Sequence, residues 1–116
     1  MSDPSPEVVE LYDAADKLKD EGKLEEAVAK LHESLAVNAK YALAHSALAV
    51  IQQRLGKHEE AVKHAQQVCE IEPRDPFSFT AMSVTYQRAY AGTNNMEYIQ
   101  LAEDAMERSR QLSQGM

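Results

Sequence analysis

Cysteine, glycine and long apolar runs are scarce in this 116-residue chain. The single cysteine, Cys69, excludes an internal disulfide framework and fits a reducing, cytoplasmic location. The four glycines are scattered, so they predict no glycine-rich phosphate-binding loop. The uncharged, mainly apolar stretch in the middle of the chain, residues 41–51, is far too short to span a bilayer. The first residues also lack the apolar segment of a secretory signal. The sequence therefore predicts a cytoplasmic protein.

Basic residues are also in short supply. Twelve lysines and arginines stand against 19 acidic residues, which gives a formal net charge of −7. Nucleic acids and anionic membranes attract basic surfaces, so we expect neither as a partner. Residues 1–40 hold ten acids and five bases, and this imbalance predicts that a partner touching this part of the chain carries positive charge.

What the sequence does contain is an internal repeat. Shifting the chain by 34 residues places Gly22 on Gly56 and Ala27 on Ala61. The segment Lys-x-Glu-Glu-Ala-Val occurs at residues 23–28 and again at residues 57–62. The helices are therefore assigned so that equivalent positions of the two repeats have the same structure.

Each repeat has a helical pattern, with apolar residues at steps of three and four. Gly22 and Gly56 stand where the first helix of a pair must end, because glycine adopts the left-handed closing conformation without steric cost. Ser5 and Asp75 each precede a proline and can cap the start of a helix. The predicted helices cover residues 6–21, 24–37, 42–55, 58–71, 76–91 and 95–112.

These residues resemble the tetratricopeptide repeat (TPR) family, whose unit is a 34-residue antiparallel helix pair with small residues at the helix contact. Ala15, Ala27, Ala49 and Ala61 match the small positions, and Pro73 matches the proline that closes a repeat. The resemblance implies an all-α fold in which three antiparallel helix pairs stack into a short right-handed superhelix, an α-solenoid.

The resemblance also implies the domain organisation. Residues 6–112 are expected to form a single TPR domain, between a disordered N-terminus (residues 1–5) and a tail (residues 113–116). The expected repeats are residues 8–41, 42–75 and 76–112, the third with an insertion near residues 91–98 that lengthens the turn or the start of the sixth helix.

The histidines predict no metal site. His58 and His64 are six residues apart, so they point about 240° away from one another on one helix and cannot chelate the same ion. The repeat places His58 at the position of Leu24, and His64 at the solvated position of Lys30. We expect His45 to be a packed, hydrogen-bonded side chain. The sequence therefore predicts neither a metal nor a cofactor.

Catalysis is not predicted either. Cys69 takes the place of Leu35 inside a helix, where cysteine behaves as a small buried hydrophobic residue. No base at a suitable spacing accompanies it. The sequence therefore predicts a protein that is not an enzyme.

The resemblance implies that the first helix of each pair lines a concave groove, which suits a peptide or a partner's helix. By spacing, the expected groove residues are Tyr12, Asp16, Leu43, Val50, Gln53, Arg54, Phe77, Thr80, Val84 and Arg88. The middle of this surface is apolar, its N-terminal end is acidic and its other end carries Arg54 and Arg88. A fitting partner has apolar anchors and a basic flank.

One class of TPR ligand is not expected. TPR proteins that hold the C-terminal carboxylate of heat-shock chaperones use a clamp of lysine, asparagine, asparagine, lysine and arginine. The matching positions are Tyr12, Asp16, Ala47, Phe77 and Ala81. None of them matches the clamp, and Asp16 would repel a carboxylate.

The favoured function is a non-enzymatic interaction module, an adaptor that binds an extended or helical peptide of a partner protein in the groove. The alternative is a self-assembling scaffold protein that uses the groove or the C-terminal helix. Tyr98, Leu101 and Leu112 are expected near one side of that helix, as a possible homodimer contact, with Ala102 and Met106 facing inward.

Overall fold

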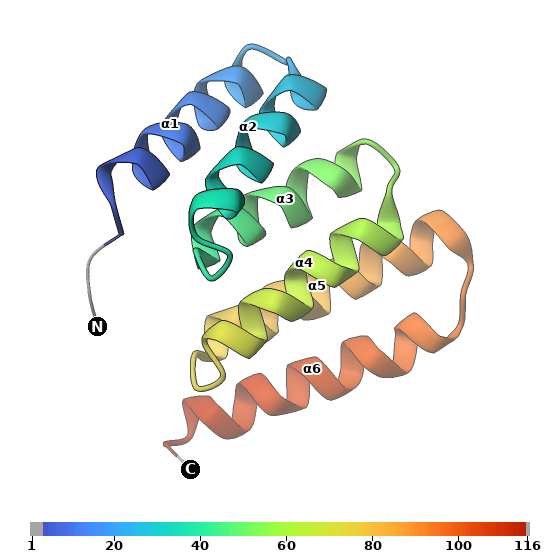
Figure 1. The fold of residues 1–116 in the computed structure, drawn as a ribbon. Coiled ribbons are helices and arrows are strands. Elements are labelled where there is room, and N and C mark those ends of the chain that lie inside the picture. The colour runs from blue at the N-terminus through green and yellow to red at the C-terminus, as the bar shows by residue number, and fades with distance from the viewer. Residues whose placement is uncertain (1–3, 116) are drawn as a thin grey trace.

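The computed structural model describes residues 4–115, which form α-helices joined by short connections, with no strand among them (Figure 1). The helices are α1 (Pro6–Asp20), α2 (Leu24–Val37), α3 (Ala42–Arg54), α4 (His58–Ile71), α5 (Pro76–Thr93) and α6 (Glu97–Ser113). The prediction of an all-α fold with six helices is confirmed. Of the expected disordered N-terminus and tail, residues 1–3 and Met116 lie outside the described residues.

Local sequence signals set the ends of several helices. The Ser5 hydroxyl accepts a hydrogen bond from the Val8 amide at the start of α1 (3.4 Å). Gly22 and Gly56, which follow α1 and α3, have φ angles of +80° and +79°. A side chain is disfavoured at such angles, so these two glycines end the first helix of their pairs as predicted.

The third helix pair is longer than the other two. α5 has 18 residues and α6 has 17, whereas the first four helices have 13 to 15. α5 continues through Gly92 to Thr93 and is closed by Asn94, which adopts the left-handed conformation (φ 60°). Asparagine tolerates this conformation better than most residues. The extra residues therefore extend α5 as well as α6, and the turn between them is short.

The core consists of two clusters, one for each end of the stack. The first joins α1, α2 and α3 through Ala15, Ala27, Leu31, Ala44, Leu48 and Ile51. The second joins α4, α5 and α6 through Val62, Tyr86, Ala89, Ala102 and Ala105. Small residues recur at the contacts because alanine lets two helix backbones approach closely, and Ala27 and Ala61 are fully buried.

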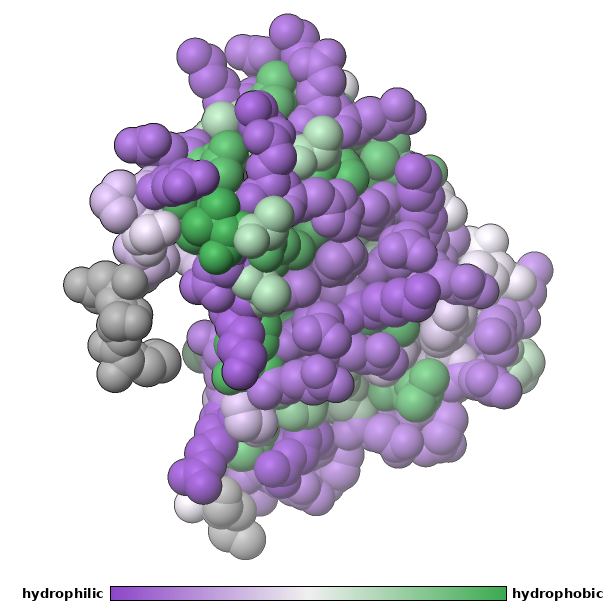
Figure 2. Space-filling model, viewed as in Figure 1, coloured by the Kyte–Doolittle hydropathy of each residue, from purple (hydrophilic) through white to green (hydrophobic). Residues whose placement is uncertain are grey.

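The outer surface is mainly polar. Figure 2 shows the face on which α4 lies in front of α5, and hydrophilic residues predominate there, with small apolar patches between them. Among the described residues, none of the helices combines the length and the apolar character needed to cross a membrane.

Candidate functional site

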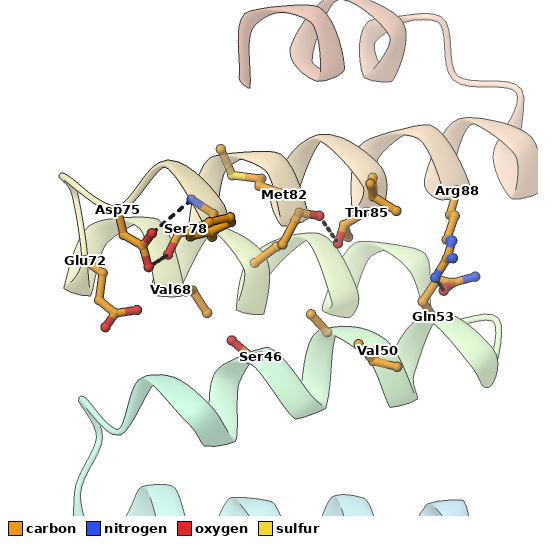
Figure 3. A pocket seen from close by; sticks show the side chains of 15 residues that line it. Ser46, Val50, Gln53, Val68, Glu72, Asp75, Ser78, Met82, Thr85 and Arg88 are labelled. Carbon is orange, nitrogen blue, oxygen red and sulfur yellow. Dashed lines mark hydrogen bonds between the residues drawn. The ribbon is translucent and has the colours of Figure 1, made fainter. Parts of the chain in front are cut away.

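A hollow of about 400 Å³ lies between α3, α4 and α5 (Figure 3), and we call it the α3–α5 groove. Its apolar lining includes Ala49 and Val50 from α3, Ala65 and Val68 from α4, and Ala81 and Val84 from α5. Helices built from small residues leave this space, because alanine side chains do not fill the gap between neighbouring backbones. The hollow is open to solvent, so an apolar side chain from outside can enter it.

The repeat places equivalent residues on the two walls of the groove. Val50 on α3 and Val84 on α5 are 34 residues apart, and both line the hollow. Large apolar side chains on these helices remain exposed: Leu43 at 53%, Val50 at 42%, Phe77 at 80% and Val84 at 37%. A cluster of exposed apolar side chains around a hollow is typical of a binding surface.

Phe77 is held at the rim of the groove by the start of α5. The Asp75 carboxylate accepts hydrogen bonds from the Phe77 amide (2.9 Å) and from the Ser78 hydroxyl (3.3 Å). Pro76 occupies the first turn of the helix, where its fixed backbone angle is favourable. The most exposed of these apolar side chains therefore stands on a rigid, capped helix end.

The two ends of the groove carry opposite charge. Glu72 and Asp75 lie at one end, and Arg88 lies at the other, as Figure 3 shows. The Arg88 guanidinium donates a hydrogen bond to the Gln53 side-chain oxygen across the groove (3.2 Å). A ligand that lies along α5 therefore meets a negative end, an apolar middle and a positive end.

Five of the ten residues predicted from the sequence line this groove: Val50, Gln53, Phe77, Val84 and Arg88. Leu43 and Arg54 are exposed on α3 but lie outside its lining. Tyr12 and Asp16 border a separate, much smaller space beside Ala47. Thr80 faces α6, where its hydroxyl is 2.6 Å from the Ser109 hydroxyl. Thr80 is therefore not placed to meet a ligand in the groove.

Sequence reasoning missed the contribution of α4. Val68 forms part of the groove lining, and Glu72, just after α4, supplies an acid at one end. The expectation that only the first helix of each pair faces a ligand hid these residues. The spacing of Val68 from Ala61 and Ala65, which share its helix face, could have revealed its place.

Cys69 lies beneath this site as a buried thiol. Its sulfur donates a hydrogen bond to the Ser78 carbonyl (3.4 Å). Burial, together with the negative charge of Asp75, raises the pKa of Cys69 to about 11. The thiol is therefore protonated at neutral pH and is a poor nucleophile.

Three histidines from α2, α3 and α4 lie close together. His45 is buried, and its Nε2 donates to the Ala39 carbonyl (2.8 Å), which confirms that it is packed and hydrogen-bonded. In the tautomer that donates at Nε2, Nδ1 of His45 accepts, and the Nδ1–H of His64 donates to it (3.0 Å). The expected solvated position of His64 is wrong, because this side chain turns inward toward His45. The His32 ring lies 5.9 Å from the His64 ring.

This arrangement favours neutral His64. Burial, helped by the neighbouring His45 and His32 rings, lowers the pKa of His64 from 6.5 to about 4. Within residues 4–115, no three histidine, cysteine, aspartate or glutamate side chains form a cluster that could hold a metal ion. His45 and His64 therefore form a hydrogen-bonded pair that joins α3 and α4.

The expected homodimer surface on α6 is broken up by packing. The Tyr98 ring stacks on Tyr86 at a centroid distance of 6.0 Å, and Ala105, on the same side of α6, belongs to the core. Leu101 is 37% exposed and Leu112 is partly buried. Tyr98 thus faces inward, because the longer α5 brings Tyr86 opposite it, and it forms no continuous outer patch with Leu101.

Comparison with known proteins agrees with this architecture. A family model described as TPR repeat matches residues 15–56, and a second one, described as tetratricopeptide repeat, matches residues 42–75. A search of curated protein sequences found no match.

Two solved structures share the fold. The second TPR of Spaghetti (RPAP3) bound to the HSP90 peptide SRMEEVD is 20% identical, with a TM-score of 0.74, over 92% of this chain and 93% of that one. The first TPR of Spaghetti (RPAP3), bound to the same peptide, is 15% identical, with a TM-score of 0.63, over 96% and 94% of the two chains. At these identities the likeness concerns the fold alone.

Proposed function

This chain belongs to the tetratricopeptide repeat family, and we propose that it is a non-enzymatic adaptor that binds a segment of a partner protein in the α3–α5 groove. The observation that carries this proposal is the exposed apolar row around the hollow, above all Phe77 at 80% exposure. Aromatic side chains that become buried in a partner's pocket tend to dominate binding energy, because each removes a large apolar area from water.

The proposed ligand differs from the acidic peptide bound to the two structural neighbours. The positions that a carboxylate clamp would use hold Tyr12, Asp16, Ala47, Phe77 and Ala81. Asp16 forms an ion pair with Lys19 (3.1 Å), so the Lys19 ammonium is already paired. We therefore propose a segment with apolar anchors and a basic flank, and a cytoplasmic setting for the complex.

The alternative, self-assembly through the C-terminal helix, has less support. Val62 and Cys69 on α4 contact α5. The equivalent positions on α6 are Glu103 and Arg110, which follow 41 residues later because the third repeat has an insertion of seven residues beyond the 34-residue period. Both are exposed. Charged residues at the two positions that would face a further helix favour contact with solvent over contact with another copy.

The test is affinity capture from a lysate of the source cells, with wild-type protein, Phe77→Ala and Met96→Ala as baits. Met96 is also an exposed apolar side chain (66%), but it lies before α6 and outside the groove, so it is a matched control. We expect a partner retained by wild type and Met96→Ala and lost with Phe77→Ala. A partner retained equally by all three baits would place the binding site elsewhere.

A further inference from the structure

The neutral polar groups of the groove are largely engaged within the protein. The Ser78 hydroxyl bonds to Asp75, the Thr85 hydroxyl donates to the Ala81 carbonyl (3.1 Å), and the Gln53 oxygen accepts from Arg88. Among the described residues, the Ser46 hydroxyl and the Gln53 amide NH2 are the neutral lining groups left to serve a ligand.

An extended ligand would need more partners than these. About 20 Å of groove separates Asp75 from Arg88, given 13 residues of α5 at a rise of 1.5 Å each. An extended segment of that length has about six residues, and beyond Ser46 and Gln53 its amide and carbonyl groups would depend on water, because the hollow is open to solvent. A helix satisfies its own backbone groups and needs only apolar contact.

The apolar rows also have helical spacing. Phe77 and Val84 line the groove on α5 and are seven residues apart, which is two turns of that wall. On α3, Val50 lines the groove, and the exposed Leu43, seven residues before it, continues the row outside the lining. Side chains at positions i, i+3, i+4 and i+7 of a bound helix would follow the same spacing and could insert between these two rows.

Charge selects the two ends of the ligand. Glu72 is exposed at one end and has no ion-pair partner among the described residues, whereas Asp75 is occupied by its cap hydrogen bonds. Among the described residues, Arg88 at the opposite end pairs only with the neutral Gln53. Resting on the proposed function, we infer that the occupant is an amphipathic α-helix of about 13 residues, with a basic side chain at the Glu72 end and an acidic one at the Arg88 end.

Two phage-displayed libraries of equal length test this inference. One presents randomised positions on a single face of a helix, and the other carries prolines that prevent helix formation. Both are selected on wild-type protein, and clones that also bind Phe77→Ala are discarded. We expect groove-dependent clones from the helical library, with apolar residues at helical spacing and opposite charges at the two ends.

The charge assignment is tested on the selected helices. Glu72→Lys and Arg88→Glu are each expected to weaken binding about tenfold or more, and a peptide with reversed end charges should restore binding to the double variant. Glu103→Lys and Arg108→Glu, both exposed on α6, are the matched controls and should change nothing. Binding that is insensitive to both groove substitutions would overturn the charge assignment.

The outcomes separate this inference from the proposed function. If Phe77-dependent clones arise only from the proline library, the ligand is extended, and the inference fails while the groove remains the binding site. If neither library gives a Phe77-dependent clone, the groove binds no segment of this size, and the proposed function fails as well.

Discussion

The imidazoles of His45 and His64 share one hydrogen bond, with 3.0 Å between their Nδ1 atoms, and the Ala39 carbonyl fixes which ring donates. Burial, together with the neighbouring His45 and His32 rings, lowers the pKa of His64 to about 4 in the fold, against 6.5 in the unfolded chain. Between these two values the unfolded chain binds the proton and the folded chain does not. Stability is therefore full above pH 6.5 and declines as the pH falls toward 4.

We expect the free energy of unfolding to drop by about 1–2 kcal/mol over this range, a value reduced for the partial exposure of His64. His64→Gln keeps a donor for His45 but does not titrate, so its stability should depend less on pH by that amount. Urea denaturation of both proteins at pH 4.5 and pH 7 measures the difference. Equal pH dependence in the two proteins would show that His64 is not held neutral.

The contact between helices predicts a second result. Ala61 is fully buried, whereas Ala29 is exposed on α2. Ala61→Leu should lower the free energy of unfolding by about 1–3 kcal/mol through overpacking. Ala29→Leu should change it by about 0.5 kcal/mol or less. Denaturant titration of the two variants measures both, and similar values would mean that the small positions are not helix contacts.

The close approach of His58 to Gly92 predicts how a substitution at Gly92 changes stability. A methyl group at Gly92 would overlap the His58 ring, whose Nδ1 is buried without a hydrogen-bond partner. Gly92→Ala should therefore destabilise the wild type by about 1–2 kcal/mol, although alanine favours a helix. In a His58→Ala background the same substitution should be neutral or stabilising. Equal effects in both backgrounds would exclude the steric explanation.

The negative charge of Asp16 on α1 predicts how salt affects partner binding. Asp16→Lys should weaken binding of a partner with a basic flank, and the loss should shrink as salt is added, because the attraction is screened. Asp104→Lys, an exposed acid on α6, is the control. The measurement is the rate at which the partner associates with wild type, Asp16→Lys and Asp104→Lys at 50 and 500 mM salt. An Asp16→Lys effect that is independent of salt would mean a loss of packing rather than of charge.

The repeat made most of the fold predictable, because Gly22, Gly56 and the alanines at equivalent positions carry its geometry in local signals. The end of α5 was not predictable, since the helix runs through Gly92 and closes at Asn94. The His45–His64 pair was missed because it depends on how α3 and α4 cross, which the spacing along one helix does not reveal. Val68 was missed for a different reason, because only the first helix of each pair was expected to face a ligand.

The predictions from spacing were strongest where one helix face decides the position. Val50 and Val84 line the groove because residues 34 apart occupy the same place on parallel walls. Thr80 is three residues after Phe77 and was therefore expected beside it in the groove. It faces α6 instead, because the third pair is longer and brings Ser109 next to it. Tyr98 turned inward toward Tyr86 for the same reason.

Site-specific photo-crosslinking tests the central claim most directly. Benzoylphenylalanine is placed at position 77 or, as the control, at position 101 on α6, and the captured partner is added, irradiated and mapped by mass spectrometry. The groove account predicts crosslinks from position 77 to a short apolar segment of the partner, and none from position 101. Crosslinks from position 101 without any from position 77 would contradict it.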